Sequence, residues 1–181
     1  MSFQNKENLS GEEIDSILEQ IMNTYSKRIY LLAYSYVKDK ESAEDISQDV
    51  LIKVYHQYNQ FRGDAALSSW IYRITVNRSK DVLRRKKLAQ LKYPFKYFEK
   101  EHWTESTENN YVKKNRKEQV LRAVFSLPVK YREVLTLHYF HDQSIEEMST
   151  TLNTNENTIK TRLSRGREKL KSNPIIREEL I

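Results

Sequence analysis

The stretch SIEEMSTTLNTNENTIKTRLSRGREKLK, residues 144–171, contains two short helical patterns separated by a polar break. Its apolar residues recur at helical spacing, first as Ile145, Met148 and Leu152 and then as Ile159, Leu163 and Leu170. The break between them is Asn153-Thr154-Asn155, residue types that cap helices and tolerate turns. Two short helices around a tight turn predict a helix-turn-helix.

The composition predicts an all-α protein. The 181 residues include only three Gly and three Pro, and good helix formers occur throughout. The absence of cysteine excludes a disulfide framework and thiolate metal sites. No apolar run approaches the roughly 18 residues of a membrane span, and the N-terminus lacks a signal pattern. We therefore expect a cytoplasmic protein.

Helical patterns fall into two groups along the chain. Residues 1–90 carry three amphipathic patterns, and residues 115–181 carry a second set that ends in the helix-turn-helix. Between them, residues 91–114 contain Pro94, scattered aromatics and a Thr/Ser/Asn/Glu stretch. This organisation predicts two small helical domains joined by a flexible linker.

Charge is distributed unevenly along the chain, which has a net charge of +6 and a pI of about 9.3. Residues 70–96 hold nine Lys or Arg and one acid, and residues 155–171 hold six basic and two acidic residues. Residues 35–49 reverse the balance, with five acids against two bases. The two basic segments favour contact with nucleic acid, whereas the acidic segment would repel it.

The second helix of the helix-turn-helix has two different faces. At about 100° per residue, one face is apolar and includes Gly166, which would let the helix approach its neighbour closely. The opposite face carries Asn157, Thr158, Thr161, Ser164, Arg165 and Glu168, and its flanks carry Lys160, Arg162, Arg167 and Lys169. Short hydrogen-bonding side chains and an Arg, flanked by cations, are typical of a recognition helix. The alternative is an amphipathic helix with a solvated basic face.

A second basic stripe follows the loop that contains Gly63. Residues Arg73, Asn77, Lys80 and Arg84 recur at helical spacing. Tyr72, which the pattern also places on an apolar face, and Trp70 are interleaved with these cations, and aromatics beside cations suit stacked single-stranded bases. A solvated stripe, with Trp70 in the core, is the alternative.

The acidic segment forms one side of a predicted helix, residues 41–58. Asp45, Gln48, Asp49 and Ile52 would face outward together, opposite the apolar Ala43, Ile46, Val50 and Val54. Two acids beside an exposed Ile fit a protein partner. A plain solvated acidic face is the alternative that this segment alone favours.

Enzyme classes find no support in the sequence. It has no Gly-rich phosphate loop, no HExxH motif and no nucleophile elbow. Its four His form no metal-ligand set. We expect no catalytic residues, no metal, no cofactor and no small-molecule substrate.

Two blocks of the sequence resemble one family. The stretch AEDISQDVLIKVYHQYNQFRGDAALSSWIYRITVNRSKDVLRRKK, residues 43–87, is similar to the second conserved region of extracytoplasmic-function (ECF, group IV) sigma factors of the sigma-70 family. The stretch LPVKYREVLTLHYFHDQSIEEMSTTLNTNENTIKTRLSRGREKL, residues 127–170, resembles their fourth region. The resemblance implies a dissociable RNA polymerase subunit that directs promoter recognition and opening, with residues 1–90 as region 2 and residues 115–181 as region 4.

The resemblance also implies roles for individual residues and partners. Core docking, on the β′ clamp helices and β subunit, would involve Asp45, Gln48, Asp49 and Ile52. Reading of the −10 element as separated strand would involve Gly63, Ser68, Tyr72, Arg73, Asn77, Lys80 and Arg84. Reading of the −35 element as duplex would involve Asn157, Thr158, Lys160, Thr161, Ser164, Arg165 and Arg167. Many family members also bind an anti-sigma factor, and the sequence leaves open whether this chain does.

The turn departs from the family pattern. Where many members have Leu-Gly, an apolar residue and Pro, this chain has Leu152 to Asn155, and Asn157 stands where Gly is common. The −35 sequence that other family members recognise therefore cannot be assigned to this chain. Two other functions remain open at this point: a stand-alone helix-turn-helix regulator, which would need a sensing or dimerisation domain, and an interaction adaptor, which leaves both basic faces unexplained.

Overall fold

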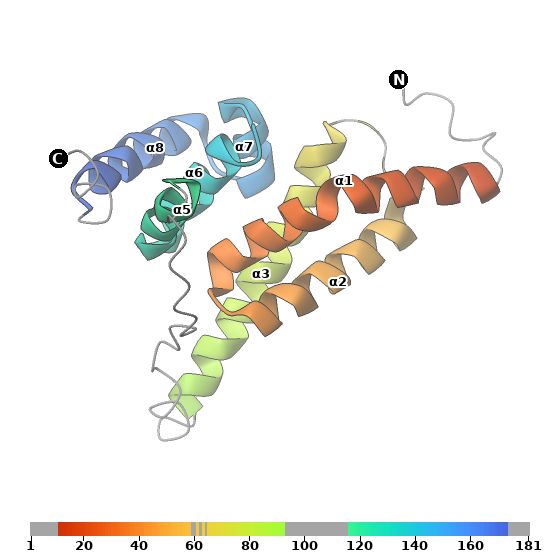
Figure 1. The fold of residues 1–181 in the computed structure, drawn as a ribbon, viewed down its shortest axis with the longest axis horizontal. Coiled ribbons are helices and arrows are strands. Elements are labelled where there is room, and N and C mark those ends of the chain that lie inside the picture. The colour runs from red at the N-terminus through yellow and green to blue at the C-terminus, as the bar shows by residue number, and fades with distance from the viewer. Residues whose placement is uncertain (1–10, 59–60, 62, 64, 93–115, 174–181) are drawn as a thin grey trace.

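A computed structural model describes residues 11–58, 61, 63, 65–92 and 116–173. All its regular elements are helices in these residues, which confirms the predicted all-α fold. Figure 1 shows α1 to α3 as one group and α5 to α8 as a second group. Beyond Lys92, the linker predicted for residues 91–114 lies outside the described residues.

The first group is a three-helix bundle of α1 (Gly11–Val37), α2 (Lys40–Gln57) and α3 (Leu67–Lys92). α1 packs against both α2 and α3 because its apolar residues, such as Ile29 and Leu32, are fully buried. The turn from α1 to α2 is tight: Lys38 adopts a left-handed φ of 53°. Asp39 then caps α2 by accepting a hydrogen bond from the Ser42 backbone N–H at 3.1 Å.

The second group consists of α5 (Arg116–Ser126), α6 (Val129–Tyr139), α7 (Ile145–Leu152) and α8 (Glu156–Lys171). A capping box starts α7, in which Ser144 and Glu147 bond reciprocally to each other's backbone N–H. Asn153 ends α7 in the left-handed region, and Asn155 caps α8 by accepting from the Asn157 N–H at 2.8 Å. These contacts confirm the predicted helix-turn-helix.

Gly166 marks a close approach of α8 to α6. A Cβ at this position would lie 3.0 Å from Leu135 Cδ1, and Leu135 itself is fully buried. The sequence predicted that Gly166 lets α8 approach its neighbour, and the packing confirms it. The buried face of α8 also contains Ile159 and Leu163, so the rest of its surface turns outward.

The two helix groups also pack directly on each other. α1 contacts α6, and α3 contacts α7. The buried apolar residues of the two groups belong to a single core cluster. The sequence predicted two domains but gave no sign of this contact between them.

Candidate nucleic-acid interface

The outer face of α8 is open. Asn157, Thr158, Lys160, Thr161, Ser164, Arg165 and Arg167 are all exposed. The caps at Ser144 and Asn155 and the packing at Gly166 hold α8 in place. A rigid helix that presents short polar side chains and cations has the form needed to enter a major groove.

Some of these side chains already have local partners. Thr161 Oγ1 donates to the Asn157 carbonyl at 2.8 Å, and Lys160 pairs with Glu156 at 3.4 Å. Arg167 Nε donates to the Tyr139 hydroxyl at 2.8 Å, and its guanidinium lies over that ring. Arg165, by contrast, makes no hydrogen bond or ion pair to any described residue. Arg165 is therefore an exposed cation on this face that no described residue pairs with.

A shallow groove of about 370 Å³ runs between α6 and α8. Its walls combine Lys130 and Tyr131 of α6 with Asn157, Thr161 and Arg165 of α8. The sequence analysis did not include the α6 residues, because their contribution depends on how α6 packs beside α8. Lys130 adds an exposed cation beside the predicted reading face.

The basic stripe on α3 is partly engaged. Arg73 and Asn77 are exposed, whereas Lys80 Nζ lies 3.6 Å from Glu133 on α6. Arg84 pairs with Asp81 at 3.0 Å across a turn of the same helix. In the preceding loop, Gly63 is exposed with a left-handed φ of 79°, and Ser68 is half-buried at the start of α3.

Tyr72 corrects one expectation, because its side chain is fully buried. Arg28 donates to its hydroxyl at 3.4 Å, and the rings of Tyr25 and His141 meet it edge-on at 6.0 and 4.7 Å. Burial raises the pKa of Tyr72 above its ordinary value. In this arrangement Tyr72 cannot stack on a base. Its place on an apolar face was the better guide to its environment.

The acidic face of α2 is exposed as its spacing predicts, since Asp45, Gln48, Asp49 and Ile52 all reach the surface. Two apolar side chains stand out there, with Ile52 and Tyr55 at 57% and 53% exposure. Large exposed apolar side chains beside acids are typical of a surface that binds protein. Tyr55 belongs to this patch, although the sequence analysis did not include it.

The acidic face and the α3 stripe meet in one groove of about 510 Å³. Asp49, Trp70, Arg73 and Asn77 line it, together with Arg78. Arg78 donates through Nε and a terminal nitrogen to Asp49 Oδ2, at 2.8 and 2.5 Å. This pair was not predicted, because only the packing of α2 on α3 brings the two residues together.

Two other kinds of site are not supported. The described residues contain no group of three or more His, Asp or Glu side chains placed to hold a metal ion. Among the same residues, no helix is long and apolar enough to cross a membrane. The described residues present two basic helix faces and one acidic-apolar face, a combination that fits a helical DNA-binding protein with a surface for a protein partner.

Comparison with known proteins gives the family. Residues 21–88 match the family described as Sigma-70 region 2, and residues 117–170 match Sigma-70, region 4. The chain is 32% identical over 165 residues to the ECF RNA polymerase sigma factor SigW of Bacillus subtilis, covering 83% of this chain and 85% of that one. It is 29% identical over 167 residues to the ECF RNA polymerase sigma-E factor of Escherichia coli, covering 84% and 85%.

Solved structures share the fold. The sigma factor RpoE in complex with the anti-sigma factor NepR from Bartonella quintana matches with a TM-score of 0.67 at 19% identity, over 85% of this chain and 94% of that chain. CnrH in complex with the cytosolic domain of CnrY matches with a TM-score of 0.62 at 20% identity, over 87% of each chain. The chain belongs to the ECF sigma factors of the sigma-70 family. It is therefore a non-catalytic initiation subunit that binds RNA polymerase core and directs promoter recognition.

Proposed function

We propose that this chain, as a group IV sigma factor acting in the cytoplasm, divides promoter recognition between its two basic helices. The N-terminal unit, residues 1–90, docks on core and reads the −10 element. The C-terminal unit, residues 115–181, reads the −35 element. One observation carries this proposal. The chain presents two basic helix faces, on α3 and α8, and one acidic-apolar face, on α2, which belongs to the same unit as α3.

The docking surface is the exposed face of α2, with Asp45, Gln48, Asp49 and Ile52. Its acids favour a basic partner surface, and the apolar side chains of Ile52 and Tyr55 supply the area that is buried on contact. The β′ clamp helices of core are the partner that the family resemblance implies. The groove between α2 and α3 would then place the docked polymerase beside the −10 surface.

The −10 surface consists of Arg73 and Asn77 in the groove, with Lys80, Arg84 and the Gly63 to Ser68 loop around them. The half-buried Trp70 lines the same groove, 5.1 Å from the Phe61 ring. An aromatic wall beside cations suits a base that has left the stack. Tyr72 would contribute from beneath this surface, as a packing residue.

The −35 surface is the open face of α8, where Asn157, Thr158, Thr161, Ser164 and Arg165 face bases and Lys160 and Arg167 face phosphates. An anti-sigma factor is a further proposed partner, since the solved structures named above are sigma factors bound to anti-sigma factors. It would have to cover the α2 face or one of the basic faces to silence the chain.

Reconstituted transcription tests this function. We expect the chain to co-purify with RNA polymerase core and to make core initiate at a defined set of sites on genomic DNA, read by sequencing the transcripts. A stand-alone regulator would bind DNA without core and would leave the start sites of core alone unchanged. That result would overturn the proposal.

A further inference from the structure

Tyr139 is a large side chain on the surface that the proposed function leaves without a role. It lies at the C-terminal end of α6 and is 53% exposed. Its hydroxyl accepts a hydrogen bond from Arg167 Nε on α8 at 2.8 Å. The Arg167 guanidinium also lies over the Tyr139 ring, with Cζ 5.7 Å from the ring centroid. The hydroxyl and the ring together tie Arg167 to the end of α6.

Tyr139 is itself supported by the residue before it in the chain. The His138 ring meets the Tyr139 ring edge-on, with the centroids 4.8 Å apart and the planes at 71°. His138 Nδ1 lies 3.2 Å from the carbonyl oxygen of Gln143, which can only accept a hydrogen bond. Gln143 is buried in the turn that leads to α7. The Tyr139 ring is therefore braced against the segment that starts the helix-turn-helix.

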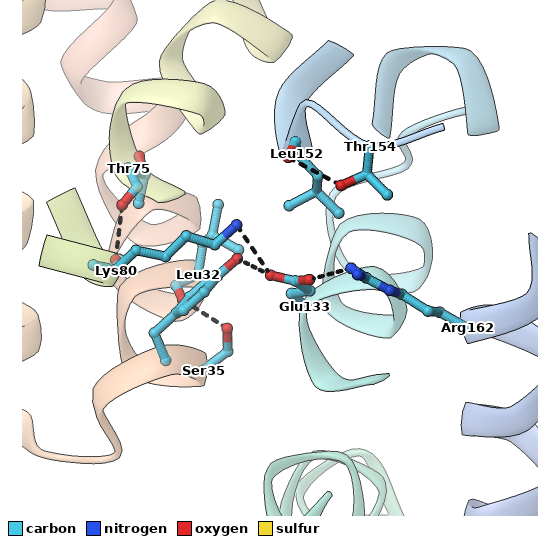
Figure 2. Close-up of polar contacts among 10 residues, drawn as sticks. Leu32, Ser35, Thr75, Lys80, Glu133, Leu152, Thr154 and Arg162 are labelled. Carbon is cyan, nitrogen blue, oxygen red and sulfur yellow. Dashed lines mark hydrogen bonds and ion pairs between the residues drawn. The ribbon is translucent and has the colours of Figure 1, made fainter. Parts of the chain in front are cut away.

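Two other cations on the flanks of α8 are paired with acids. Lys160 lies 3.4 Å from Glu156 on the same helix. Arg162 donates to the buried carboxylate of Glu133 at 2.8 Å, and Figure 2 shows this pair. A nearby carboxylate offsets the charge of each of these side chains and competes with phosphate for it. The partner of Arg167 is a neutral phenol, so the positive charge of Arg167 stays available to an anion.

The contact with Tyr139 also leaves free the part of Arg167 that can bind phosphate. A guanidinium has five N–H donors, and Tyr139 takes only the one on Nε. The two terminal nitrogens of Arg167 bond to no described residue, and such a pair can bind a phosphate through two parallel hydrogen bonds. A side chain that is already held in one conformation loses less conformational entropy when it binds. Tyr139 therefore preorganises Arg167 for an anion.

We propose that Tyr139 is a positioning residue for the −35 surface, which holds the Arg167 guanidinium in place to bind one phosphate of the duplex backbone. This inference rests on the proposed function, because it concerns the same exposed surface of α8. Phosphate contacts do not depend on base sequence, and they fix the register and orientation of a protein on the duplex. Tyr139 therefore affects how α8 lies in the major groove without contacting a base.

The salt dependence of duplex binding tests this role, because Tyr139→Phe removes no charge. The probe is a short fluorescein-labelled duplex of mixed sequence, and its anisotropy gives the affinity of the full chain between about 50 and 200 mM salt. Each phosphate contact contributes about 0.9 to the slope of log affinity against log salt concentration, so Arg167→Ala should lower the slope by about that amount. Tyr139→Phe keeps the ring and removes only the hydroxyl. It should weaken binding about three- to tenfold and shift the slope toward the Arg167→Ala value.

Further variants separate positioning from a purely structural role. In the Arg167→Ala background, Tyr139→Phe should have no further effect on affinity, because Tyr139 acts only through Arg167. Arg167→Lys keeps the charge but lacks Nε, so it should be equally insensitive to Tyr139→Phe. Tyr34→Phe on α1 is the matched control, since the Tyr34 hydroxyl bonds to no described residue, and it should keep the wild-type affinity and slope. Urea unfolding verifies that each variant is folded.

The outcomes distinguish the positioning role from the proposed function. If folded Tyr139→Phe binds duplex with the wild-type affinity and slope, the positioning role is wrong and the −35 surface stands. If Tyr139→Phe weakens binding without changing the slope, or equally in the wild-type and Arg167→Ala backgrounds, Tyr139 acts independently of Arg167 and the role is also wrong. If the wild-type chain binds no duplex with or without core, the −35 function of α8 fails, and the positioning role fails with it.

Discussion

The two basic helices, α3 and α8, carry similar residues but lie in different environments. The face of α8 proposed to read duplex is exposed, and Arg165 there makes no hydrogen bond or ion pair to a described residue. The corresponding surface of α3 is partly covered, since Lys80 is paired with Glu133 and Tyr72 is fully buried. One helix is ready to meet duplex in the free chain, whereas the other is partly occupied by the second group of helices.

This difference matches what each surface would have to do. Duplex presents its base edges to any rigid helix that fits the major groove, so α8 needs no partner to be competent. A base from separated strand must first be unstacked, at a cost of a few kcal/mol. A small free domain has little binding energy to offset that cost, and the α2 docking face lies on the same unit as α3.

The largest effect expected is on stability, from Tyr72→Ala. Tyr72 fills a fully buried site between α1 and the α6–α7 turn, so its truncation should lower the free energy of unfolding by about 3–5 kcal/mol. Urea unfolding followed by circular dichroism measures this. The exposed Arg73→Ala is the control and should stay within about 0.5 kcal/mol of wild type. If Tyr72→Ala is as stable as wild type and fails only in promoter opening, Tyr72 contacts DNA and its role as a packing residue is wrong.

Charge reversal on α2 should have the next largest effect. Asp45→Lys with Asp49→Lys places like charges against the basic partner and breaks the Asp49–Arg78 pair, so core affinity should fall by about 2–5 kcal/mol. Competition for core measures it. Duplex binding by α8 in the free chain should be unchanged. That result would show that the substitutions affect core docking and not DNA binding by the second unit. Wild-type core affinity in the folded double mutant would contradict the docking assignment.

A smaller effect is expected on the open face of α8. Arg165→Ala should cost about 1–3 kcal/mol of promoter affinity and relax the preference at one base pair of the −35 element. Lys160→Ala is the matched comparison, because a phosphate contact should weaken all sequences alike and reduce the salt dependence by about one counterion. Transcription of a panel of −35 variants measures both. An unchanged ranking with Arg165→Ala would show that this side chain reads no base.

The smallest effect concerns pH and the buried His141. Burial lowers the pKa of His141, while its ring contacts with the Arg28 and Thr136 carbonyls oppose the shift, and the neutral ring donates to one of these carbonyls. Arg28, Asp142 and Tyr72 are the ionisable groups around it. The folded chain then binds fewer protons than the unfolded chain, so this contribution to stability is fully present above pH about 6.5 and is lost as the pH falls below it. The free energy of unfolding, measured with urea, should decrease between pH 7.5 and 5.5. His141→Asn should remove that pH dependence, and its persistence would assign it to another group.

The sequence predicted the elements whose determinants are local. The α7–α8 turn followed from Asn153 and Asn155, which do end one helix and cap the next. The close packing at Gly166 followed from a small residue on an apolar face. At the turn, the deciding atoms lie within a few residues of one another, so spacing and residue type suffice. At Gly166, residue type alone predicted a close approach, and it did not identify the neighbour, Leu135 on α6.

The sequence missed contacts between residues that are far apart in the chain. Arg78 meets Asp49 only because α2 packs on α3, and Tyr36 meets Glu133 only because α1 packs on α6. Tyr72 was assigned to DNA because its neighbours are cations, but the pattern does not tell which partner covers an aromatic ring. Side-chain type indicated the chemistry of each surface, and tertiary packing decided which side chains remain available.

The most direct test of the central claim, that α3 acts on separated strand and α8 on duplex, is permanganate reactivity of thymines around the start site. The free chain should leave duplex promoter unreactive, and core with the chain should make these thymines reactive. Asn77→Ala and Arg73→Ala should reduce that reactivity on duplex, and a template premelted at the −10 element should restore it. If the free chain opens duplex unaided, or if both variants open it as well as wild type, the role assigned to α3 is wrong.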